Sequence, residues 1–354
     1  MKIFLIRSSL IHGGAERVIT ELANEFAKNK HEVHMVILAV SEDFYSLHPE
    51  IKIHRLGFLN KGALKKQFAE LKTFFKLREL LKTERPDASL SFGPKYNILT
   101  ILASSFLGLK IFVSDRSNPR KKIDWHIDLV RRLTYRFANG VIAQTSLAKK
   151  LQERTTGNKN IKVIPNPVKE VKLYPEIKCE KIILNVGRLV PEKGQKFLLE
   201  AFKNLNVSDW KLVILGDGPL RGDLENQAKK LQIENKVIMP GAVNNVDEWL
   251  AKASIFAFPS VSEGFPNALL EAMAAELPCV SFDCDAGPRD IITDGENGFL
   301  VELYDVEAFS NKLEQLTNSI VHRQKIGYSA KQYAKRFNIR DISEAFLGFI
   351  TKNN

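Results

Sequence analysis

Four charged residues in the second half of the sequence have the types and spacing to hold a sugar phosphate. Arg188 and Lys193 flank a short turn, and Glu263 and Glu271 lie on either side of a Gly-Phe-Pro-Asn sequence. Arginine offers a diphosphate a planar fork of donors, and lysine adds a point charge. Carboxylates accept hydrogen bonds from the hydroxyls of a ribose or sugar ring. We predict one ligand site from these four residues, although a solvated loop and a carboxylate that stabilises a helix dipole would use the same residue types.

The stretch between the two glutamates predicts a helix start that can bind an anion. We expect a strand to end before Glu263 and a helix to begin near Asn267, which is a residue type suited to an N-cap. Free N–H groups around Gly264–Ala268, a segment that includes Phe265, Pro266 and Asn267, could then hold a phosphate. Glu271 has apolar neighbours in the sequence, so we expect it to be buried and to need a partner.

The first loop of the chain, Gly13-Gly14-Ala-Glu16, has paired glycines before a helix whose apolar residues share one face. Such a start lets backbone N–H groups approach an anionic ligand, but a tight turn without a ligand would have the same sequence. The loop lacks the G-x-G-x-x-G pattern, so the sequence does not support a dinucleotide site here.

Metal ligands are sparse in the sequence. Asp283 and Asp285 form a D-x-D pattern without further carboxylates around it, and the three cysteines contain no C-x-x-C pair. We therefore predict neither a metal nor a cofactor.

Strand-like apolar runs alternate with helical patterns twice along the chain. In the first half they are residues 2–7, 32–40, 51–55, 88–92, 111–114 and 141–144, and in the second half 181–186, 211–215, 236–239, 255–258, 279–282 and 298–301. Several are continuous rather than alternating, which is typical of parallel strands buried on both faces. The pattern predicts two doubly wound α/β domains, with ligands outside the carboxyl ends of the strands.

We place the domain boundary near Ile164-Pro-Asn-Pro167, because two closely spaced prolines stop regular structure. The predicted divisions are a first domain over residues 1–165, a second over 166–335, and a final helix over 336–354 that is free to pack back on the first domain.

The charge is divided unevenly between the halves. Residues 1–170 hold 30 Lys and Arg against 16 Asp and Glu, whereas the remainder holds 22 against 25. Residues 64–85 form a basic helical pattern. Eight cations lie in or just before it: Lys61, Lys65, Lys66, Lys72, Lys76, Arg78, Lys82 and Arg85. We expect an ordinary surface helix or one that meets an anionic membrane or a polyphosphate. We predict no nucleic-acid partner, because no reader motif is present.

The sequence contains no signal peptide pattern and no apolar run long enough for a membrane span. We therefore expect a cytoplasmic chain that is peripheral on the inner face of the plasma membrane.

Together these motifs resemble the retaining glycosyltransferases of family 4, which have the GT-B fold, two Rossmann-like domains that face a central cleft. The resemblance rests on the Gly13-Gly14 loop, Val186-Gly-Arg-Leu-Val-Pro-Glu-Lys-Gly194, Gly216-Asp-Gly-Pro219 and the Glu263-x7-Glu271 segment. It implies that Arg188 and Lys193 hold the donor diphosphate, that Glu271 binds the ribose and that Glu263 contacts the transferred sugar. It also implies that residues 264–267 cradle phosphate, with Gly14 approaching from the other domain.

One position departs from the family pattern. Many members carry a histidine near the sugar after the fifth strand, where this chain has Arg116. The segment from Ser281 to Leu300 is similar to that of bacterial enzymes that assemble surface glycans. This implies a UDP-linked hexose or N-acetylhexosamine donor and a polyprenyl-diphosphate-linked or lipopolysaccharide-type acceptor. A sugar-nucleotide epimerase, a phosphorylase and an inactive nucleotide-sugar-binding subunit remain as alternatives.

Overall fold

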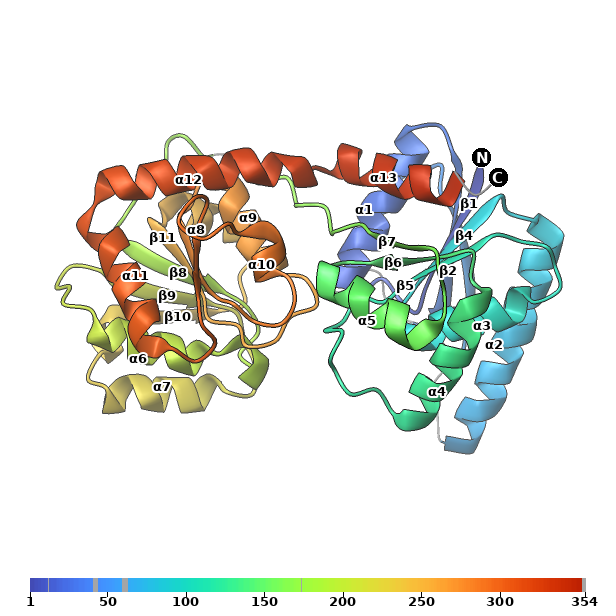
Figure 1. Cartoon of the computed structure of the whole chain (residues 1–354), viewed down its shortest axis with the longest axis horizontal. Helices are drawn as coiled ribbons and strands as arrows, with labels where there is room; N and C mark the ends of the chain where they lie inside the picture. Colours follow the sequence, from blue (N-terminus) through green and yellow to red (C-terminus); the bar gives the residue numbers. More distant parts are fainter. Residues whose placement is uncertain (12, 41–43, 59–62, 173, 352–354) are drawn as a thin grey trace. The chain divides into compact units, whose positions relative to one another are not determined.

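The computed structural model describes residues 1–11, 13–40, 44–58, 63–172 and 174–351. It divides into two compact units. The first combines Met1–Pro167 with Ile339–Asn354, and the second is Val168–Asn338. Each unit has a parallel sheet with helices on both faces (Figure 1).

The sheet of the first unit has the strand order β3-β2-β1-β4-β5-β6-β7, and every neighbouring pair is parallel. Its strands are β1 (Lys2–Arg7), β2 (Glu32–Ala39), β3 (Lys52–Phe58), β4 (Ala88–Phe92), β5 (Ile111–Ser114), β6 (Gly140–Ala143) and β7 (Ile161–Val163). Its helices are α1 (Gly14–Lys28), α2 (Ala63–Glu84), α3 (Pro94–Ser104), α4 (Trp125–Thr134), the short η1 (Tyr135–Phe137), α5 (Ser146–Thr156) and α13 (Ile339–Thr351).

The sheet of the second unit has the order β10-β9-β8-β11-β12-β13 and is also parallel. Its strands are β8 (Ile182–Val186), β9 (Lys211–Leu215), β10 (Val237–Gly241), β11 (Ile255–Phe258), β12 (Cys279–Phe282) and β13 (Phe299–Val301). Its helices are η2 (Pro191–Lys193), α6 (Gln195–Asn204), α7 (Arg221–Lys230), η3 (Glu234–Lys236), α8 (Val246–Lys252), α9 (Asn267–Ala274), α10 (Pro288–Ile291), α11 (Val306–Asn318), α12 (Ile320–Ala334) and η4 (Lys335–Phe337).

These strand orders confirm the predicted doubly wound α/β class. The central strands have almost no exposed side chain on either face, which explains why they read as continuous apolar runs. The one strand that we did not predict is β7, whose three residues include an exposed lysine at the edge of the sheet. A segment this short has no periodicity to recognise.

Helix α13 belongs to the core of the first unit. Ile342, Phe346 and Ile350 are buried with residues of α1 and of the central strands. The Phe346 ring lies 6.5 Å from that of Phe92, and Phe349 lies 5.6 Å from Phe112. The end of the chain therefore completes the face of the sheet that α1 covers.

We expect Phe346→Ala to lower the free energy of unfolding of the first unit by about 3–5 kcal/mol, because it removes a fully buried aromatic ring. Amide hydrogen exchange in β1 and β4 measures this loss unit by unit. Glu344→Ala, an exposed change on the same helix, should stay within about 0.5 kcal/mol of the parent. Equal protection of β1 in the two variants would show that α13 does not support this core.

Candidate active site

The predicted site lies at the point where the strand order of the second sheet reverses. Strands β8 and β11 are neighbours, and the chain leaves them for opposite faces of the sheet: α6 packs in one core and α9 in the other. Loops that part in this way leave a crevice at the carboxyl ends of the strands. The loop after β8 carries Arg188 and Lys193, and the loop after β11 carries Glu263.

The two loops touch closely at a glycine. Gly194 has a φ of +64°, and a Cβ built on it would lie 2.1 Å from the carbonyl oxygen of Pro259. The backbone N–H of Val261 donates to the Glu192 carbonyl at 2.9 Å. A side chain at position 194 would therefore separate the loops, and only glycine accepts both the backbone angle and the contact.

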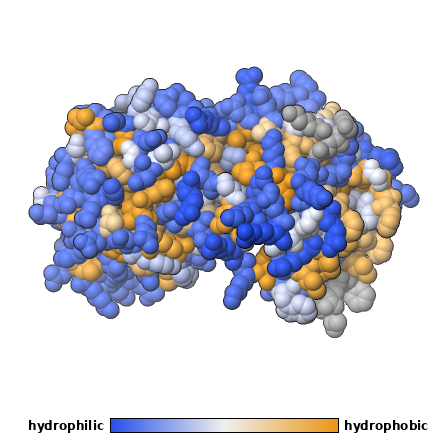
Figure 2. Space-filling model, viewed as in Figure 1, coloured by the Kyte–Doolittle hydropathy of each residue, from blue (hydrophilic) through white to orange (hydrophobic). Residues whose placement is uncertain are grey.

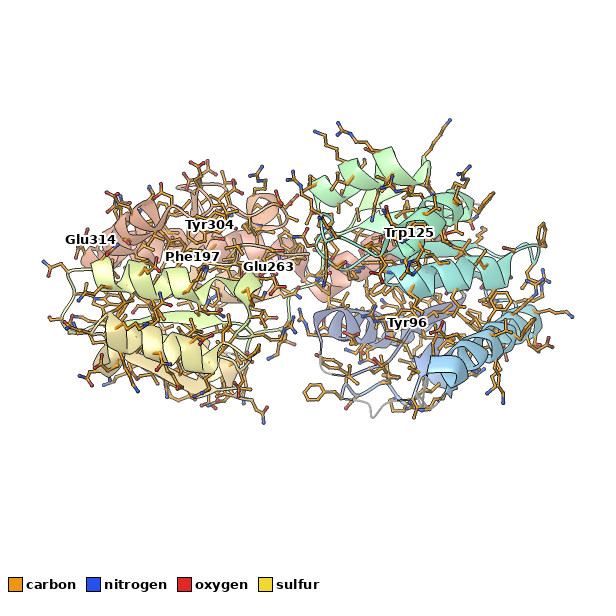
Figure 3. All side chains as sticks on the ribbon, turned by 90° about the horizontal axis from the view of Figure 1, so that it is seen from below. Tyr96, Trp125, Phe197, Glu263, Tyr304 and Glu314 are labelled. Atoms are coloured by element: carbon orange, nitrogen blue, oxygen red, sulfur yellow. The ribbon has the colours of Figure 1, made fainter. Side chains whose placement is uncertain are left out.

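This contact brings Lys193 and Glu263 together. The Lys193 Nζ donates to Glu263 Oε1 at 2.6 Å, with the lysine side chain 23% exposed and the glutamate side chain 8% exposed. A buried carboxylate needs a partner, and here the lysine supplies it. The lysine Nζ also lies 5.7 Å from the centre of the Phe258 ring. The site therefore has one fixed, partly buried ion pair, whose acid is labelled in Figure 3.

Arg188 lies on the same loop as Lys193 but, in the part of the chain that the structure describes, its side chain is not paired with a carboxylate. Its side chain is exposed, and among the described residues it has no hydrogen bond or ion pair. Its backbone carbonyl is held by the Nε2 of buried Gln195 at 3.1 Å. The loop is thus fixed while the guanidinium remains accessible to an anion.

The start of α9 differs by one residue from the prediction. Asn267 is the first helical residue rather than the N-cap, which is Pro266, and its N–H donates to the Phe265 carbonyl at 3.0 Å. The N–H of Leu270 bonds to Pro266, which leaves those of Ala268 and Leu269 without an acceptor in the described structure. The free N–H of Ala268 lies within the predicted range and that of Leu269 one residue beyond it, while Gly264 and Asn267 are partly exposed beside them.

The burial that we predicted for Glu271 is found at Glu263 instead. Glu263 is the buried acid, whereas Glu271, which we expected in an apolar setting, is only partly buried. Its apolar neighbours Leu270 and Ala272 point into the core while Glu271 lies on the outer side of the helix. The 3.6-residue period of the helix separates side chains that are adjacent in sequence.

Sequence reasoning missed two residues that border the ion pair. Cys284 is buried, and burial together with the charge of Glu263 raises the pKa of its thiol to about 12. Gln195 supports Arg188, and its Oε1 is buried without a hydrogen-bond partner. Only the spatial proximity reveals either residue, because Cys284 lies between two aspartates and Gln195 between Gly194 and Lys196, and neither pattern is specific for a binding site.

Asp283 of the D-x-D pattern has a protein partner. Arg289 donates to both of its carboxylate oxygens at 2.8 Å, which is a bidentate pair. Among the described residues, no cluster of three or more His, Cys, Asp or Glu side chains is arranged to hold a metal ion. Nor is any described helix long and apolar enough to cross a bilayer.

The remaining predicted residues, Gly14 and Arg116, belong to the first unit. Gly14 is the first residue of α1, and the Glu16 carboxylate folds back beside Gly13 while it pairs with Arg7 at 2.6 Å. A carboxylate in this position already complements the positive end of the helix dipole.

Arg116 follows β5 in a largely enclosed position. Its guanidinium stacks over the Phe92 ring at 4.2 Å and faces Phe346 at 5.4 Å, and its Nη1 donates to Asn166 Oδ1 at 2.7 Å. Burial and the nearby charge of Arg7 lower the pKa of Arg116 to about 9, so it is still a cation at neutral pH. Its Nε and Nη2 are buried and have no hydrogen-bond partner. Two donors of a cation are thus available.

Comparison with known proteins agrees with this arrangement of two parallel-sheet units. The family model described as "Glycosyltransferase Family 4" matches residues 12–171, and the model described as "Glycosyl transferases group 1" matches residues 170–333. A transferase of Campylobacter jejuni is 34% identical over 99% of both chains. The chain therefore belongs to the family 4, group 1 glycosyltransferases, and it is a glycosyltransferase.

Some of the similar proteins are named for acting on lipid-linked glycans. The Campylobacter protein is named an alpha-1,4-N-acetyl-D-galactosaminyltransferase for a diacetylbacillosamine-containing glycan on undecaprenyl diphosphate. A UDP-Gal:alpha-D-GlcNAc-diphosphoundecaprenol alpha-1,3-galactosyltransferase of Escherichia coli is 28% identical over 71% of this chain and 72% of its own. The HepE protein of Anabaena, solved with UDP-glucose, has a TM-score of 0.81 at 20% identity and covers 99% of this chain and all of its own. That likeness supports the GT-B fold.

We expect Gly194→Ala to lower the thermal midpoint and to cost more than about 1 kcal/mol, because the new methyl group would meet Pro259 on a backbone angle that favours glycine. Gly222→Ala is the matched control, since a Cβ there meets nothing within 4 Å and the residue lies in α7. It should be neutral or stabilising. Equal midpoints for the two variants would contradict the close contact of the loops.

The three cysteine thiols should differ in their reactivity towards an alkylating reagent because they differ in burial. Cys179 is exposed, whereas Cys279 and Cys284 are buried and burial raises the pKa of both. Because the thiolate is the nucleophile, iodoacetamide at pH 8 should alkylate Cys179 alone in the native protein and all three after denaturation. Mass spectrometry counts the adducts. Rapid native alkylation of Cys284 would show that the pocket beside Glu263 is open.

Proposed function

We propose that this enzyme transfers a hexose or N-acetylhexosamine from a UDP-sugar to a polyprenyl-diphosphate-linked glycan, with retention of the anomeric configuration. The observation that carries the donor assignment is the Lys193–Glu263 pair beside accessible Arg188 and the start of α9. Cationic side chains and free N–H groups are the donors that a diphosphate requires. The named relatives that use lipid diphosphates support the acceptor class.

Each residue has a part in this proposal. Arg188, Lys193 and the backbone of residues 264–269, which includes the free N–H groups of Ala268 and Leu269, bind the diphosphate. Phe265 and Pro266 shape the turn. Glu271 accepts the ribose hydroxyls and Glu263 a hydroxyl of the transferred sugar. Gly14 and Arg116 contribute from the first unit, where the free Arg116 donors suit an oxygen of the donor.

The bond between the anomeric carbon and the phosphate oxygen breaks as negative charge grows on the leaving diphosphate. The acceptor hydroxyl attacks from the same face, and its proton passes to the leaving phosphate oxygen. The cations stabilise the growing charge, and each such preorganised contact is worth about 3 kcal/mol. Lys193 enters this step already oriented by Glu263.

The proposed acceptor class favours an anionic membrane surface as the location of the enzyme. The first 170 residues carry the excess of cations, and Lys72, Lys76 and Lys82 are exposed on α2. Lys61 and the side chains of Lys65 and Lys66 lie outside the described residues. We propose a peripheral enzyme on the inner face of the plasma membrane, which is the leaflet where anionic lipids attract basic segments.

We expect Arg188→Ala to lower kcat by about 10²–10³-fold, because an exposed side chain that stabilises only the leaving group contributes to the transition state and not to the fold. Arg336→Ala, an exposed arginine elsewhere in the second unit, is the control. Steady-state transfer and thermal midpoints are measured together. Near-normal turnover of Arg188→Ala with an unchanged midpoint would reject its role.

The donor should stabilise the second unit. A UDP-sugar at about 100 times its Kd adds about 2.7 kcal/mol to the free energy of unfolding, and UDP-sugars should exceed GDP-sugars in a thermal-shift screen. An NMR time course then distinguishes the alternatives. Conversion of the donor without an acceptor would indicate an epimerase, and binding without any conversion would indicate an inactive subunit.

A further inference from the structure

Helix α4 of the first unit has its polar and apolar sides reversed. Arg131 and Thr134 face inward and are buried, as is Tyr135 directly after the helix, whereas Trp125, Leu129 and Leu133 face outward. A surface helix of a globular protein normally turns its apolar stripe to the core. The exception therefore calls for a physical reason.

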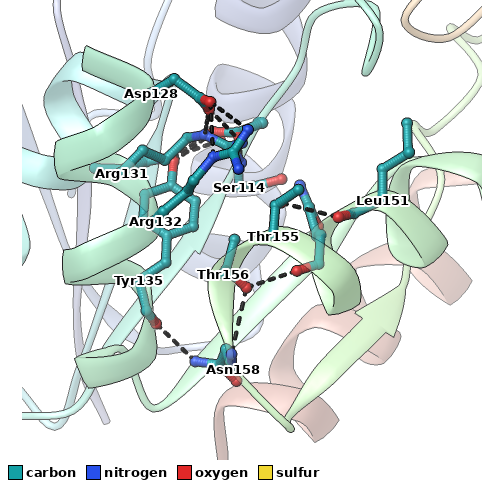
Figure 4. Close-up of polar contacts among 12 residues, drawn as sticks. Ser114, Asp128, Arg131, Arg132, Tyr135, Leu151, Thr155, Thr156 and Asn158 are labelled. Carbon is teal, nitrogen blue, oxygen red and sulfur yellow. Dashed lines mark hydrogen bonds and ion pairs between the residues drawn. The ribbon is translucent and has the colours of Figure 1, made fainter. Parts of the chain in front are cut away.

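The inward side is held by polar contacts (Figure 4). Arg131 donates to Asp128 at 2.7 Å. Arg131 also lies 3.6 Å from Asp115, and Tyr135 donates to Asp115 at 2.6 Å. Asn158 donates to the Tyr135 carbonyl at 2.8 Å. Asp128 lies on α4 itself, whereas Asp115 and Asn158 lie on other segments, so the bonds to these two residues hold this side of the helix inward.

The outward side forms what we call the α4 stripe: Trp125, Leu129, Leu133 and Phe137. These side chains are 78%, 50%, 49% and 73% exposed, and they recur every four residues along α4 and η1. Trp125 is labelled in Figure 3, which views the structure from below. Single exposed apolar residues are ordinary, but a row of large ones marks an interaction surface.

The neighbouring helices extend the same kind of surface. Helix α3 packs between α2 and α4, and α2 exposes Leu71 and Phe75. Phe106, in the loop after α3, is fully exposed. Figure 2 shows apolar side chains interspersed with hydrophilic ones on the visible face of this unit. Exposed apolar side chains thus occur on α2, after α3 and on α4, which follow one another through α3.

Charge decides which partner this surface fits. Residues 120–137 contain six Lys and Arg and only two Asp and Glu, and Lys121, Lys122, Arg132 and Arg136 are exposed beside the stripe. Two copies of this surface would bring like charges together. An anionic bilayer instead offers phosphates to the cations, acyl chains to the leucines and an interfacial layer that tryptophan prefers.

We propose that the α4 stripe inserts into the surface of an anionic membrane, with Lys121, Lys122 and Arg136 on the lipid phosphates. The helix lies in the plane of the interface and does not cross the bilayer. This inference rests on the proposed lipid-linked acceptor and adds the element that anchors the enzyme. Salt distinguishes this mode of membrane binding from binding by the cations of α2. Binding through an inserted apolar stripe persists in high salt, whereas a purely electrostatic contact is screened.

The first test compares two triple variants in vesicle flotation with phosphatidylglycerol–phosphatidylcholine vesicles. Trp125→Gln/Leu129→Gln/Leu133→Gln removes the stripe and keeps good helix formers, so circular dichroism and thermal midpoint should be unchanged. The control Ile320→Gln/Val321→Gln/Tyr328→Gln removes three comparably exposed apolar residues from α12. We expect the stripe variant to lose more than about tenfold in partitioning and the control to behave as the parent. Equal losses, or none, would overturn the proposal.

The second test changes only charge. Lys121→Glu/Lys122→Glu/Arg136→Glu should weaken binding to anionic vesicles and leave the weaker binding to pure phosphatidylcholine nearly unchanged. In high salt the parent should keep part of its vesicle binding, whereas the stripe variant should not bind. Binding that salt abolishes completely in the parent would assign the contact to α2 or another basic surface.

Two further measurements distinguish membrane insertion of the α4 stripe from a contact between copies of the chain and from the proposed transferase function. Sedimentation velocity that shows a parent dimer and a monomeric stripe variant would make the stripe a contact between copies and overturn the proposal. Transfer to a short-chain, water-soluble acceptor should be equal in the parent and the stripe variant. Stripe-dependent vesicle binding without any transfer would reject the proposed function and support the membrane role of the α4 stripe. Transfer together with vesicle binding that does not depend on the stripe would support the proposed function and overturn the membrane role.

Discussion

The candidate site depends on the close contact of two loops at the carboxyl edge of the second sheet. Gly194 lies against the Pro259 carbonyl, and this contact sets Lys193 within hydrogen-bond distance of Glu263. The contact is possible because β8 and β11 are neighbours at the strand-order reversal, where the chain leaves in opposite directions. Backbone geometry, rather than the attraction between the two charges, therefore builds the site; the ion pair satisfies a carboxylate that the fold has already buried.

The first unit uses cations in two different ways. Arg116 is enclosed between Phe92 and Phe346, tied to Asn166 and left with two unpartnered donors, which suits a ligand atom that arrives at a defined place. The cations near α4 are exposed and stand beside apolar side chains, which suits an extended partner such as a lipid surface. Helix α13 contributes to the first of these, because its Phe346 belongs both to the core and to the surroundings of Arg116.

Much of the fold could be predicted because parallel strands buried on both faces have a distinctive composition. Strands β1, β4, β5, β9, β11 and β12 lie at the predicted residues, and the alternation of strands with helices indicates the class. Boundaries were less accurate where local preference and tertiary packing differ. Asn267 has the residue type of an N-cap, yet Pro266 holds that position because the loop packs against Gly287, where a Cβ would lie 2.3 Å from the Pro266 ring. Tertiary contact thus overrides capping preference.

The sequence by itself determined the class of fold, the family and the set of charged residues at strand ends, since these depend on residue type and order. It could not determine which of those residues meet. Strand order and helix rotation decide three such facts: Lys193 pairs with Glu263, Glu271 lies on the outer side of its helix, and Arg289 pairs with Asp283. The reversed orientation of α4 is decided in the same way: its buried Arg131 and Tyr135 are anchored to Asp115 on a different element, so long-range polar bonds, not the local apolar pattern, set which side faces outward.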